Sequence, residues 1–465
     1  MNNFLQRVFK GDRYVWIVFI ALCIISIIEM FSASSSLVSR SGSIHAPIMR
    51  HVSFMAAGFV LILLIQLVDF KWMRLGGYIF WAFSIALLVY TLAFGVEQAG
   101  SARFLNIAGF QFQPSEFAKI SLVLVVADQI ERMQDIEYQA RYFWWVLGGV
   151  ILTCLLIFLE NLSTAALLFG TVLCMMFIGE VSWKRLVASL SIVLVGLTII
   201  LSVAAIIPES VYRENDNKVV KLFDRAYTWV ARINNFVSPS DADSEQQNKY
   251  VITDKNYQAS HAQIAVARGG FLPHMPGSSV QRDYLPEAFS DYIFAIIIEE
   301  GGFFVGLIVI ALYLILLYRA YKVAKTANSL FCAIVVIGVS LLIVFQALIH
   351  IAVSVHLIPV TGQPLPLVSR GGTSMIVNCI YFGIIISITR SIYTENETSV
   401  ENAVAAESAA IKPQSQDDTL ILETTTSDSR PASTPDDDEV VIEVATPSQA
   451  NPISGEEDEI IITEN

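Results

Sequence analysis

Residues 284–302 read YLPEAFSDYIFAIIIEEGG, an apolar run that holds four acidic residues. These are Glu287, Asp291, Glu299 and Glu300. An ionised carboxylate is costly in hydrocarbon and usually faces a wet cavity, a partner or a substrate. Pro286 suits the first turn of a helix, which predicts a membrane helix that starts near residue 288 at one surface and runs inward.

Asp291 is the candidate for chemistry on this predicted helix, because it lies near the membrane surface, where a lipid-linked head group can reach it. Glu287 is four residues earlier and is expected on the same side. Glu299 lies about 12 Å deeper at 1.5 Å per residue. Glu299 and Glu300 therefore need buried partners and are expected to fix helix contacts. A purely structural role is an equally good interpretation at this point, because the helix dipole favours a carboxylate such as Asp291 at the start of a helix.

The whole chain has the composition of an all-α polytopic membrane protein. Of its 465 residues, 54% are hydrophobic and only 15% are charged, and the apolar residues cluster in long blocks. The blocks predict ten transmembrane helices, at 14–32, 52–68, 77–95, 115–130, 143–159, 164–179, 187–207, 288–318, 331–355 and 374–389. Ten spans place both ends of the chain on one side.

The basic residues predict which side that is. Thirteen of them fall in the loops on the side of the termini: Arg7, Lys10, Arg13, Lys71, Arg74, Arg132, Arg141, Lys184, Arg185, Arg319, Lys322, Lys325 and Arg390. Four fall in the opposite short loops: Arg40, Arg50, Arg103 and Arg370. Since basic residues accumulate in cytoplasmic loops, both termini are expected in the cytoplasm, and the long loop 208–287, between helices 7 and 8, outside.

The acidic charge of the chain is confined to its end. Residues 393–465 carry eighteen Asp and Glu against two basic residues, a net charge of −16, so the total of −13 leaves +3 for residues 1–392. This stretch is rich in Ser, Thr, Asp, Glu and Pro, and such a composition cannot bury enough apolar surface to fold alone. We therefore expect a transmembrane domain at 1–392 and a disordered cytoplasmic tail at 393–465, which serves as a solvated spacer or carries short docking segments.

The long external loop contains two predicted helices. In VVKLFDRAYTWVARINNF (219–236), apolar residues recur at helical spacing and Arg232 lies largely off that face. The pattern predicts an amphipathic helix that lies either on the membrane or on the helix bundle. In YQASHAQIAVARGG, a short helix is expected from Gln258 and is ended by Gly269 and Gly270.

Further polar residues gather on the external side. FQFQPSEFAKI (110–120) places Glu116 and Lys119 three residues apart, as an intrahelical ion pair would require. HLIPVTGQPLPLVSRGGTSM (356–375) has prolines and glycines that describe irregular backbone at membrane depth, which is tolerated where it lines a cavity or is covered by protein. Basic side chains and glycine-rich backbone on one face suit a diphosphate group, although snorkelling at the interface explains single cations as well.

Three segments resemble the signature regions of the SEDS proteins (shape, elongation, division and sporulation). They are FQPSEFAK (112–119), YLPEAFSDYIFAIIIEEGG (284–302) and PVTGQPLPLVSRGGTS (359–374). The resemblance covers roughly residues 14–392, with the same order of motifs and a long loop after the seventh span. PLPLVS, GGTS and the extended tail are more similar to the members that act in cell division, and VTG to those that act in elongation.

The resemblance implies a peptidoglycan glycosyltransferase that polymerises lipid II at the outer face of the cytoplasmic membrane. It matches Asp291 to the family's catalytic aspartate, and Glu116 and Lys119 to the glutamate and lysine of a family motif, and it places Arg103, Arg282 and Ser369 among the substrate-binding residues. It also implies a class B penicillin-binding protein, a transpeptidase, and other divisome proteins as partners, and no nucleic acid. This sequence departs from the family pattern at Asn161, His350 and Arg370, and no role is carried over to these positions. For His350, a hydrogen-bonded place in the core is favoured over a role as a base.

Asp291 is expected to act as a general base, because the departing lipid diphosphate needs no proton and one base suffices. Arg103, Lys119 and Arg282 are expected to balance the diphosphate charge, with Mg²⁺ or Mn²⁺ as one further means, although the sequence contains no motif for a metal site built from protein side chains alone. Two other classes are open. A lipid II transporter is expected to have internal repeats with matching broken segments in the two halves of the chain, and none is seen in the sequence. A scaffold would depend on its tail and long loop.

Overall fold

The computed structural model describes residues 11–41, 45–98, 101–107, 110–135, 137–206, 228–233, 236, 252, 256–285 and 288–410. Long helices make up most of the described chain. They are α2 (Arg13–Ser41), α3 (His45–Ile65), α4 (Phe70–Phe94), α5 (Pro114–Arg132), α6 (Gln139–Glu160), α7 (Leu162–Ile178), α8 (Trp183–Ile206), α12 (Ile293–Thr326), α13 (Leu330–Ser354) and α14 (Gly372–Ala410). Each predicted membrane segment coincides with one of these helices.

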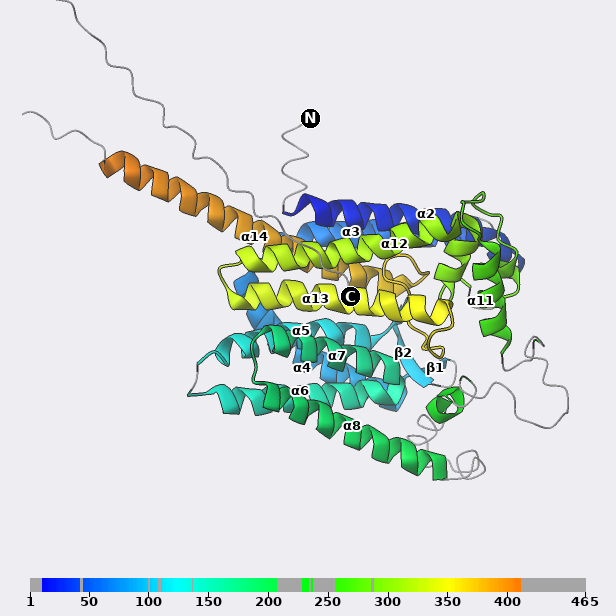
Figure 1. The fold of residues 1–465 in the computed structure, drawn as a ribbon, viewed down its shortest axis with the longest axis horizontal. Helices are drawn as coiled ribbons and strands as arrows, with labels where there is room; N and C mark the ends of the chain where they lie inside the picture. The colour runs from blue at the N-terminus through cyan, green and yellow to red at the C-terminus, as the bar shows by residue number, and fades with distance from the viewer. Residues whose placement is uncertain are drawn as a thin grey trace, which may run out of the picture. The chain divides into compact units, whose positions relative to one another are not determined.

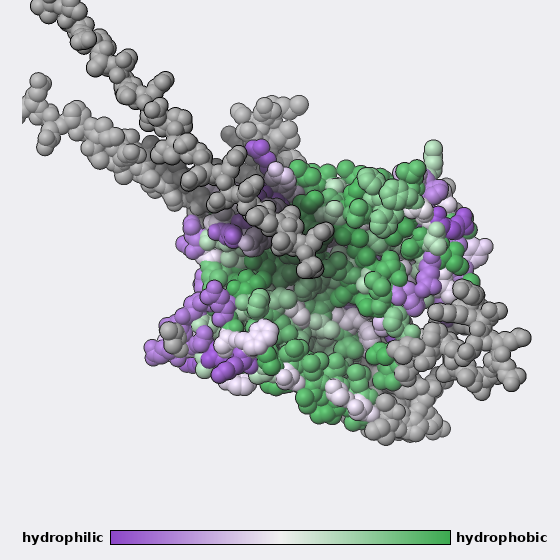
Figure 2. Space-filling view, viewed as in Figure 1, coloured by the Kyte–Doolittle hydropathy of each residue, from purple (hydrophilic) through white to green (hydrophobic). Residues whose placement is uncertain are grey.

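Eight of these helices are long and apolar enough to cross a membrane, all except α5 and α7. Helix α7 is apolar but has only 17 residues, and α5 carries several charged residues within its 19. Figure 2 shows apolar residues covering the middle of the visible face, with hydrophilic residues gathered toward its two ends. This distribution is that of an integral membrane protein.

The helices run side by side in the compact unit that ends at Ala406 (Figure 1). In the most apolar window of α13, 78% of the residues are buried, against 11% in α8. Helix α13 packs on α5, α7 and α12, and α8 packs on α7. Many apolar side chains of α8 are exposed, among them Leu194, Val195 and Ile199, as expected for contact with lipid.

Charged residues on α5 are tolerated inside the bundle because each has a partner. Lys119 pairs with Glu116, and Asp128 with Arg132 at 2.8 Å and Arg74 at 3.3 Å. Arg74 also pairs with Glu131. Paired charges cost far less to bury than single ones, so α5 can occupy an interior position that its charge content would otherwise forbid.

Helix α12 is interrupted at Gly302, where φ is 70° and ψ is 176°. A Cβ atom at this position would lie 2.7 Å from the carbonyl carbon and oxygen of Leu272. The amide of Phe303 donates to the carbonyl of Gly270 at 3.0 Å. Only glycine adopts this backbone conformation readily, and only glycine admits so close an approach. At this interruption α12 therefore contacts the chain that follows α11 (Tyr257–Arg268).

At one end of the bundle, α11 and a small sheet gather (Figure 1). The sheet is antiparallel, in the order β1 (Val96–Gln98), β2 (Ser101–Ile107) and β3 (Phe110–Phe112). Its register pairs Glu97 with Ala102, and Asn106 with Gln111. The sequence prediction did not include these strands. Helix α11 was predicted, and Gly269 ends it as expected.

Two predicted boundaries differ from the structure. The predicted helix start near residue 288 is wrong, because residues 288–292 form turns and α12 begins at Ile293. The proposed pairing of Glu287 with Asp291 on one helix face assumed that start, and Glu287 itself lies outside the described residues. Of the predicted tail, residues 393–410 continue α14 as helix, and residues 411–465 lie outside the described chain.

Candidate active site

Asp291 lies on the turns that precede α12, and its side chain is partly exposed. The Ser290 hydroxyl donates to Oδ1 of Asp291 at 3.1 Å. Because Tyr292 is the N-cap residue and the first turn of α12 has no acidic residue, Asp291 stands before the helix rather than within its first turn. The aspartate is therefore held at the end of the bundle where α11 lies, and part of its surface is accessible.

The α13–α14 connection (residues 355–371) fixes the backbone around Asp291. The hydroxyl of Ser369 donates to the carbonyl of Ser290 at 2.8 Å and accepts from the amide of Leu365 at 2.7 Å. The amide of Arg370 donates to the carbonyl of Phe289 at 2.9 Å. Ser369, expected at the substrate, has its hydroxyl engaged between two main-chain groups, so in this structure it positions the turn that carries Asp291.

His350 supports the same connection from α13. Its ring is fully buried, Nε2 accepts from the amide of Phe294 at 3.4 Å, and Nδ1 lies 2.8 Å from the carbonyl of Gln363. Because Nε2 accepts a hydrogen bond, it carries no hydrogen in the neutral ring, and Nδ1 is the donor to that carbonyl. The prediction that His350 is a hydrogen-bonded core residue is confirmed.

Lys119 and Glu116 form the predicted ion pair, with Nζ 2.9 Å from Oε1. The lysine is fully buried and also donates to Oε1 of Gln346 on α13 at 3.0 Å. Gln346 in turn donates to the carbonyl of Pro364 at 2.9 Å. The pair is thus linked through α13 to the α13–α14 connection, and its role at a diphosphate stays a prediction.

Asn161 occupies the N-cap of α7. Its Oδ1 accepts from the amides of Ser163 at 3.0 Å and Thr164 at 3.4 Å, which satisfies donors that a helix start leaves unpaired. The hydroxyl of Thr164 accepts from Nε2 of Gln363 at 2.7 Å. Within the α13–α14 connection, residues 361, 363 and 365–369 are buried, whereas Leu357 and Arg370 are exposed, so protein covers only part of this irregular backbone.

Glu299 and Glu300 hold the chain that joins α11 to α12. Glu299 accepts from the Ser279 hydroxyl and from the amides of Val280 and Gln281, both at 3.2 Å. Glu300 accepts from the amides of Gly277 at 2.9 Å and Ser279 at 3.2 Å. Both carboxylates are buried, and a carboxylate with several N–H donors is well satisfied there. The expected structural role of these two residues is confirmed.

The cations proposed from the sequence are placed as follows. Arg282 donates to the carbonyl of Ser32 at 3.0 Å and lies 3.7 Å from Oε1 of Glu300, so it belongs to the Glu300 cluster. Arg103 lies on β2, and its side chain is outside the described residues. Lys119 is bound to Glu116, as described above.

Sequence reasoning missed Arg232, which was assigned only to the polar face of a loop helix. Residues 228–233 are helical, hereafter the loop helix. Arg232 donates to the carbonyl of Val360 at 3.0 Å, and Phe236 stacks on His356 with ring centroids 5.0 Å apart. These described residues of the loop thus pack on the bundle. Burial lowers the pKa of Arg232, and the nearby negative charge of Asp291 opposes that shift. Its one sequence signal was a basic residue within an otherwise apolar turn.

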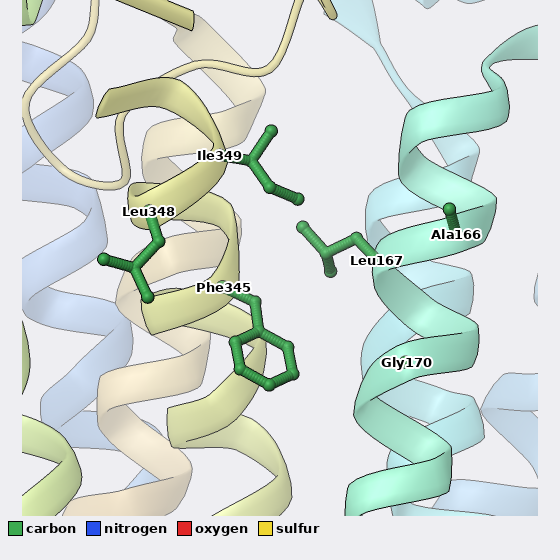
Figure 3. A pocket seen from close by; sticks show the side chains of 6 residues that line it. All are labelled: Ala166, Leu167, Gly170, Phe345, Leu348 and Ile349. Carbon is green, nitrogen blue, oxygen red and sulfur yellow. The ribbon is translucent and has the colours of Figure 1, made fainter. Parts of the chain in front are cut away.

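An apolar groove opens between α7 and α13, away from these polar groups (Figure 3). Its volume is about 280 Å³, and its lining residues are Ala166, Leu167, Gly170, Phe345, Leu348 and Ile349. None of these side chains can bind an ion or carry a proton.

No group of three His, Cys, Asp or Glu side chains that could hold a metal ion is present among the described residues.

The fold and the site together define an integral membrane protein with a partly exposed aspartate held at one end of its helix bundle. The model of the family described as "Cell cycle protein", which covers FtsW, RodA and SpoVE, matches residues 12–394. The chain belongs to this family, which is the SEDS family that its motifs resemble.

Relatives and solved structures agree with this assignment. The chain is 30% identical over 389 residues to a probable peptidoglycan glycosyltransferase FtsW of Halomonas elongata, covering 81% of this chain and 90% of the relative. It is 31% identical to the one of Thiomicrospira cyclica, over 68% and 74%. Its fold is similar to that of RodA of Thermus thermophilus, with a TM-score of 0.54, 21% identity and 82% and 98% coverage. It is also similar to a chain of a peptidoglycan synthase complex, with a TM-score of 0.59, 20% identity and the same coverage.

Proposed function

We propose that this protein is a peptidoglycan glycosyltransferase that polymerises lipid II into glycan strands at the outer face of the cytoplasmic membrane during cell division. The observation that carries the proposal is the place of Asp291. It is partly exposed, and the turns before α12 that carry it are bound to the α13–α14 connection. A carboxylate fixed in this way can meet a head group that enters from the membrane surface. The FtsW relatives support the activity and favour a division role over elongation.

In the proposed reaction, Asp291 accepts the proton of the 4-hydroxyl of the N-acetylglucosamine of the acceptor lipid II. The oxygen forms a bond to C1 of the N-acetylmuramic acid at the reducing end of the growing chain. The bond from C1 to the diphosphate breaks, the configuration at C1 inverts, and undecaprenyl diphosphate leaves with the electron pair. One base is sufficient because the leaving group needs no proton.

The diphosphate needs positive charge in the transition state. Arg103, Lys119 and Arg282 stay the proposed sources, although Lys119 and Arg282 must first exchange their present partners. Mg²⁺ or Mn²⁺ stays a proposal as well. Because the described residues offer no three-ligand cluster, such an ion would take oxygen ligands from the diphosphate itself.

We also propose ten spans with both termini in the cytoplasm and the 208–287 loop outside. In this arrangement the ten spans are the eight helices that are long and apolar enough to cross a membrane, together with α5 and α7. A class B penicillin-binding protein is the proposed partner, with other divisome proteins at the septum. The fold similarity to a chain of a peptidoglycan synthase complex supports it.

Asp291→Asn tests the function. The purified full-length protein, alone and with its transpeptidase, is given lipid II, and the glycan product is separated by length. Loss of a general base is expected to lower polymer formation by about 10²–10⁴-fold, while the thermal unfolding midpoint stays unchanged. Polymer at the wild-type rate from Asp291→Asn would remove this aspartate from catalysis. Fluorescent lipid II in liposomes separates the transporter alternative, which predicts movement across the bilayer without polymer.

A further inference from the structure

Arg232 is bound to the same connection that binds the turn carrying Asp291. Its guanidinium donates to the carbonyl of Val360 at 3.0 Å and lies over the Trp229 ring, with Cζ 5.5 Å from the centroid. The connection that contains Val360 ends at Ser369 and Arg370, which bind the backbone of Ser290 and Phe289. One segment of chain therefore fixes both the arginine and the turn that carries the aspartate.

The environment of Arg232 is unusual for an arginine on an external loop. The residue is half-buried, and the negative charge of Asp291 opposes the lowering of its pKa by burial, so the two charges lie within electrostatic range of each other. The Tyr292 hydroxyl is itself buried without a hydrogen-bond partner among the described residues. Burial removes water from a cation and disfavours its charged form, and a nearby anion stabilises that charged form. The arrangement is thus that of a partly buried cation with a carboxylate near it.

We propose that Arg232 is a positioning residue of the glycosyltransferase: fixed by Val360, its guanidinium keeps Asp291 ionised and oriented, so that the aspartate can accept a proton near neutral pH. The inference rests on the proposed function and assigns a role to the external loop helix. A carboxylate that was half-buried without this charge would hold its proton more tightly and be a poorer base at low pH. The guanidinium has donors beyond the one bound to Val360.

Other charged or titratable groups lie on the elements packed against this turn. Arg370 belongs to the α13–α14 connection, and His350 on α13 accepts from the amide of Phe294. His350 is fully buried with both ring nitrogens engaged. Tyr292 titrates far above neutral pH in any environment of this kind. Arg232 and Arg370 are accordingly the two cations to distinguish, and only Arg232 belongs to the loop helix.

The test compares the pH dependence of polymer formation in Arg232→Gln, Arg232→Lys and wild type. Initial rates are measured with the full-length protein and its transpeptidase at sub-saturating lipid II, between about pH 5 and pH 9. Removing an opposite charge near a carboxylate raises the pKa of that carboxylate, by about one unit or more. The acidic limb of the kcat/KM profile should therefore move up by about one pH unit or more in Arg232→Gln. At a pH below both limbs, a limb that lies one pH unit higher lowers the rate about tenfold, and at a pH above both limbs the rate recovers.

Two variants separate the charge of Arg232 from other effects. Arg50→Gln removes an exposed arginine that lies over the Phe54 ring of α3 and should not move the acidic limb. Arg232→Lys should retain the wild-type limb because it keeps the charge.

Three results would overturn or redirect the inference. A rate loss in Arg232→Gln that is equal at every pH would overturn it, because this result would mean that Arg232 serves only to dock the loop helix. A higher KM for lipid II with an unmoved limb would also overturn it and would indicate a direct contact with the diphosphate. If wild type itself forms no polymer, the proposed function fails rather than this inference.

Discussion

Replacing Gly302 with alanine measures how strongly the interruption of α12 is constrained. The backbone there has φ 70° and ψ 176°, a region that only glycine occupies without strain of about 1–3 kcal/mol. The added Cβ would also lie 2.7 Å from the carbonyl carbon and oxygen of Leu272, and 2.9 Å from the carbonyl oxygen of Phe271. These are main-chain atoms, so the clash is relieved only if the backbone moves. We therefore expect Gly302→Ala to lower the free energy of unfolding by about 2–4 kcal/mol.

The assay is thermal or SDS-induced unfolding of the full-length protein in detergent. Gly148→Ala on α6 is the matched control, because no heavy atom lies within 4 Å of its added Cβ; it should be unchanged or more stable by up to about 1 kcal/mol. Leu272→Ala in the Gly302→Ala background should not restore stability, because the clash does not involve that side chain. Wild-type stability of Gly302→Ala, or rescue by Leu272→Ala, would refute the reasoning.

Two further substitutions examine buried polar groups. Asn161→Ala removes the N-cap of α7 and should lower the free energy of unfolding by about 1 kcal/mol, whereas Asn161→Asp keeps an acceptor and should lie close to wild type in the same unfolding assay. Lys119→Met leaves the Glu116 carboxylate buried without its cation. This variant should lower the free energy of unfolding by about 3–5 kcal/mol. The double variant Lys119→Met with Glu116→Gln should recover part of that loss, and no recovery would mean that Lys119 stabilises the fold through Gln346 instead.

Much of the helical framework can be predicted from sequence, because long apolar segments have few stable arrangements in a bilayer. The same physics predicted that Glu299 and Glu300 would need partners and that Lys119 would pair with Glu116, since unpaired buried charges are too costly to persist. In each case the requirement is local to the residue, and for Glu299 and Glu300 only the identity of the partners had to come from the structure.

The features that sequence reasoning missed depend on contacts between distant segments. Residues 288–292 were predicted as helix, but their backbone is bound by Ser369 and Arg370, about eighty residues away in the chain, and those bonds replace the helical ones. The conformation of Gly302 is set in the same way by the chain after α11. For Arg232, the polar face of an amphipathic pattern does not say which carbonyl it will meet.

The α13–α14 connection explains how one aspartate can be held so firmly in a molecule made of separate helices. It accepts hydrogen bonds from Arg232 at Val360, from Tyr313 of α12 at Pro366 and from Ser26 of α2 at Val368. It also donates to Thr164 of α7 and binds the turn before α12. Irregular backbone inside a membrane protein must have its polar groups satisfied by protein, and here the groups that satisfy it come from helices on several sides. The same bonds that satisfy the polar groups of this backbone therefore fix the position of the turn that carries Asp291, so any element that shifts the connection also shifts the proposed base.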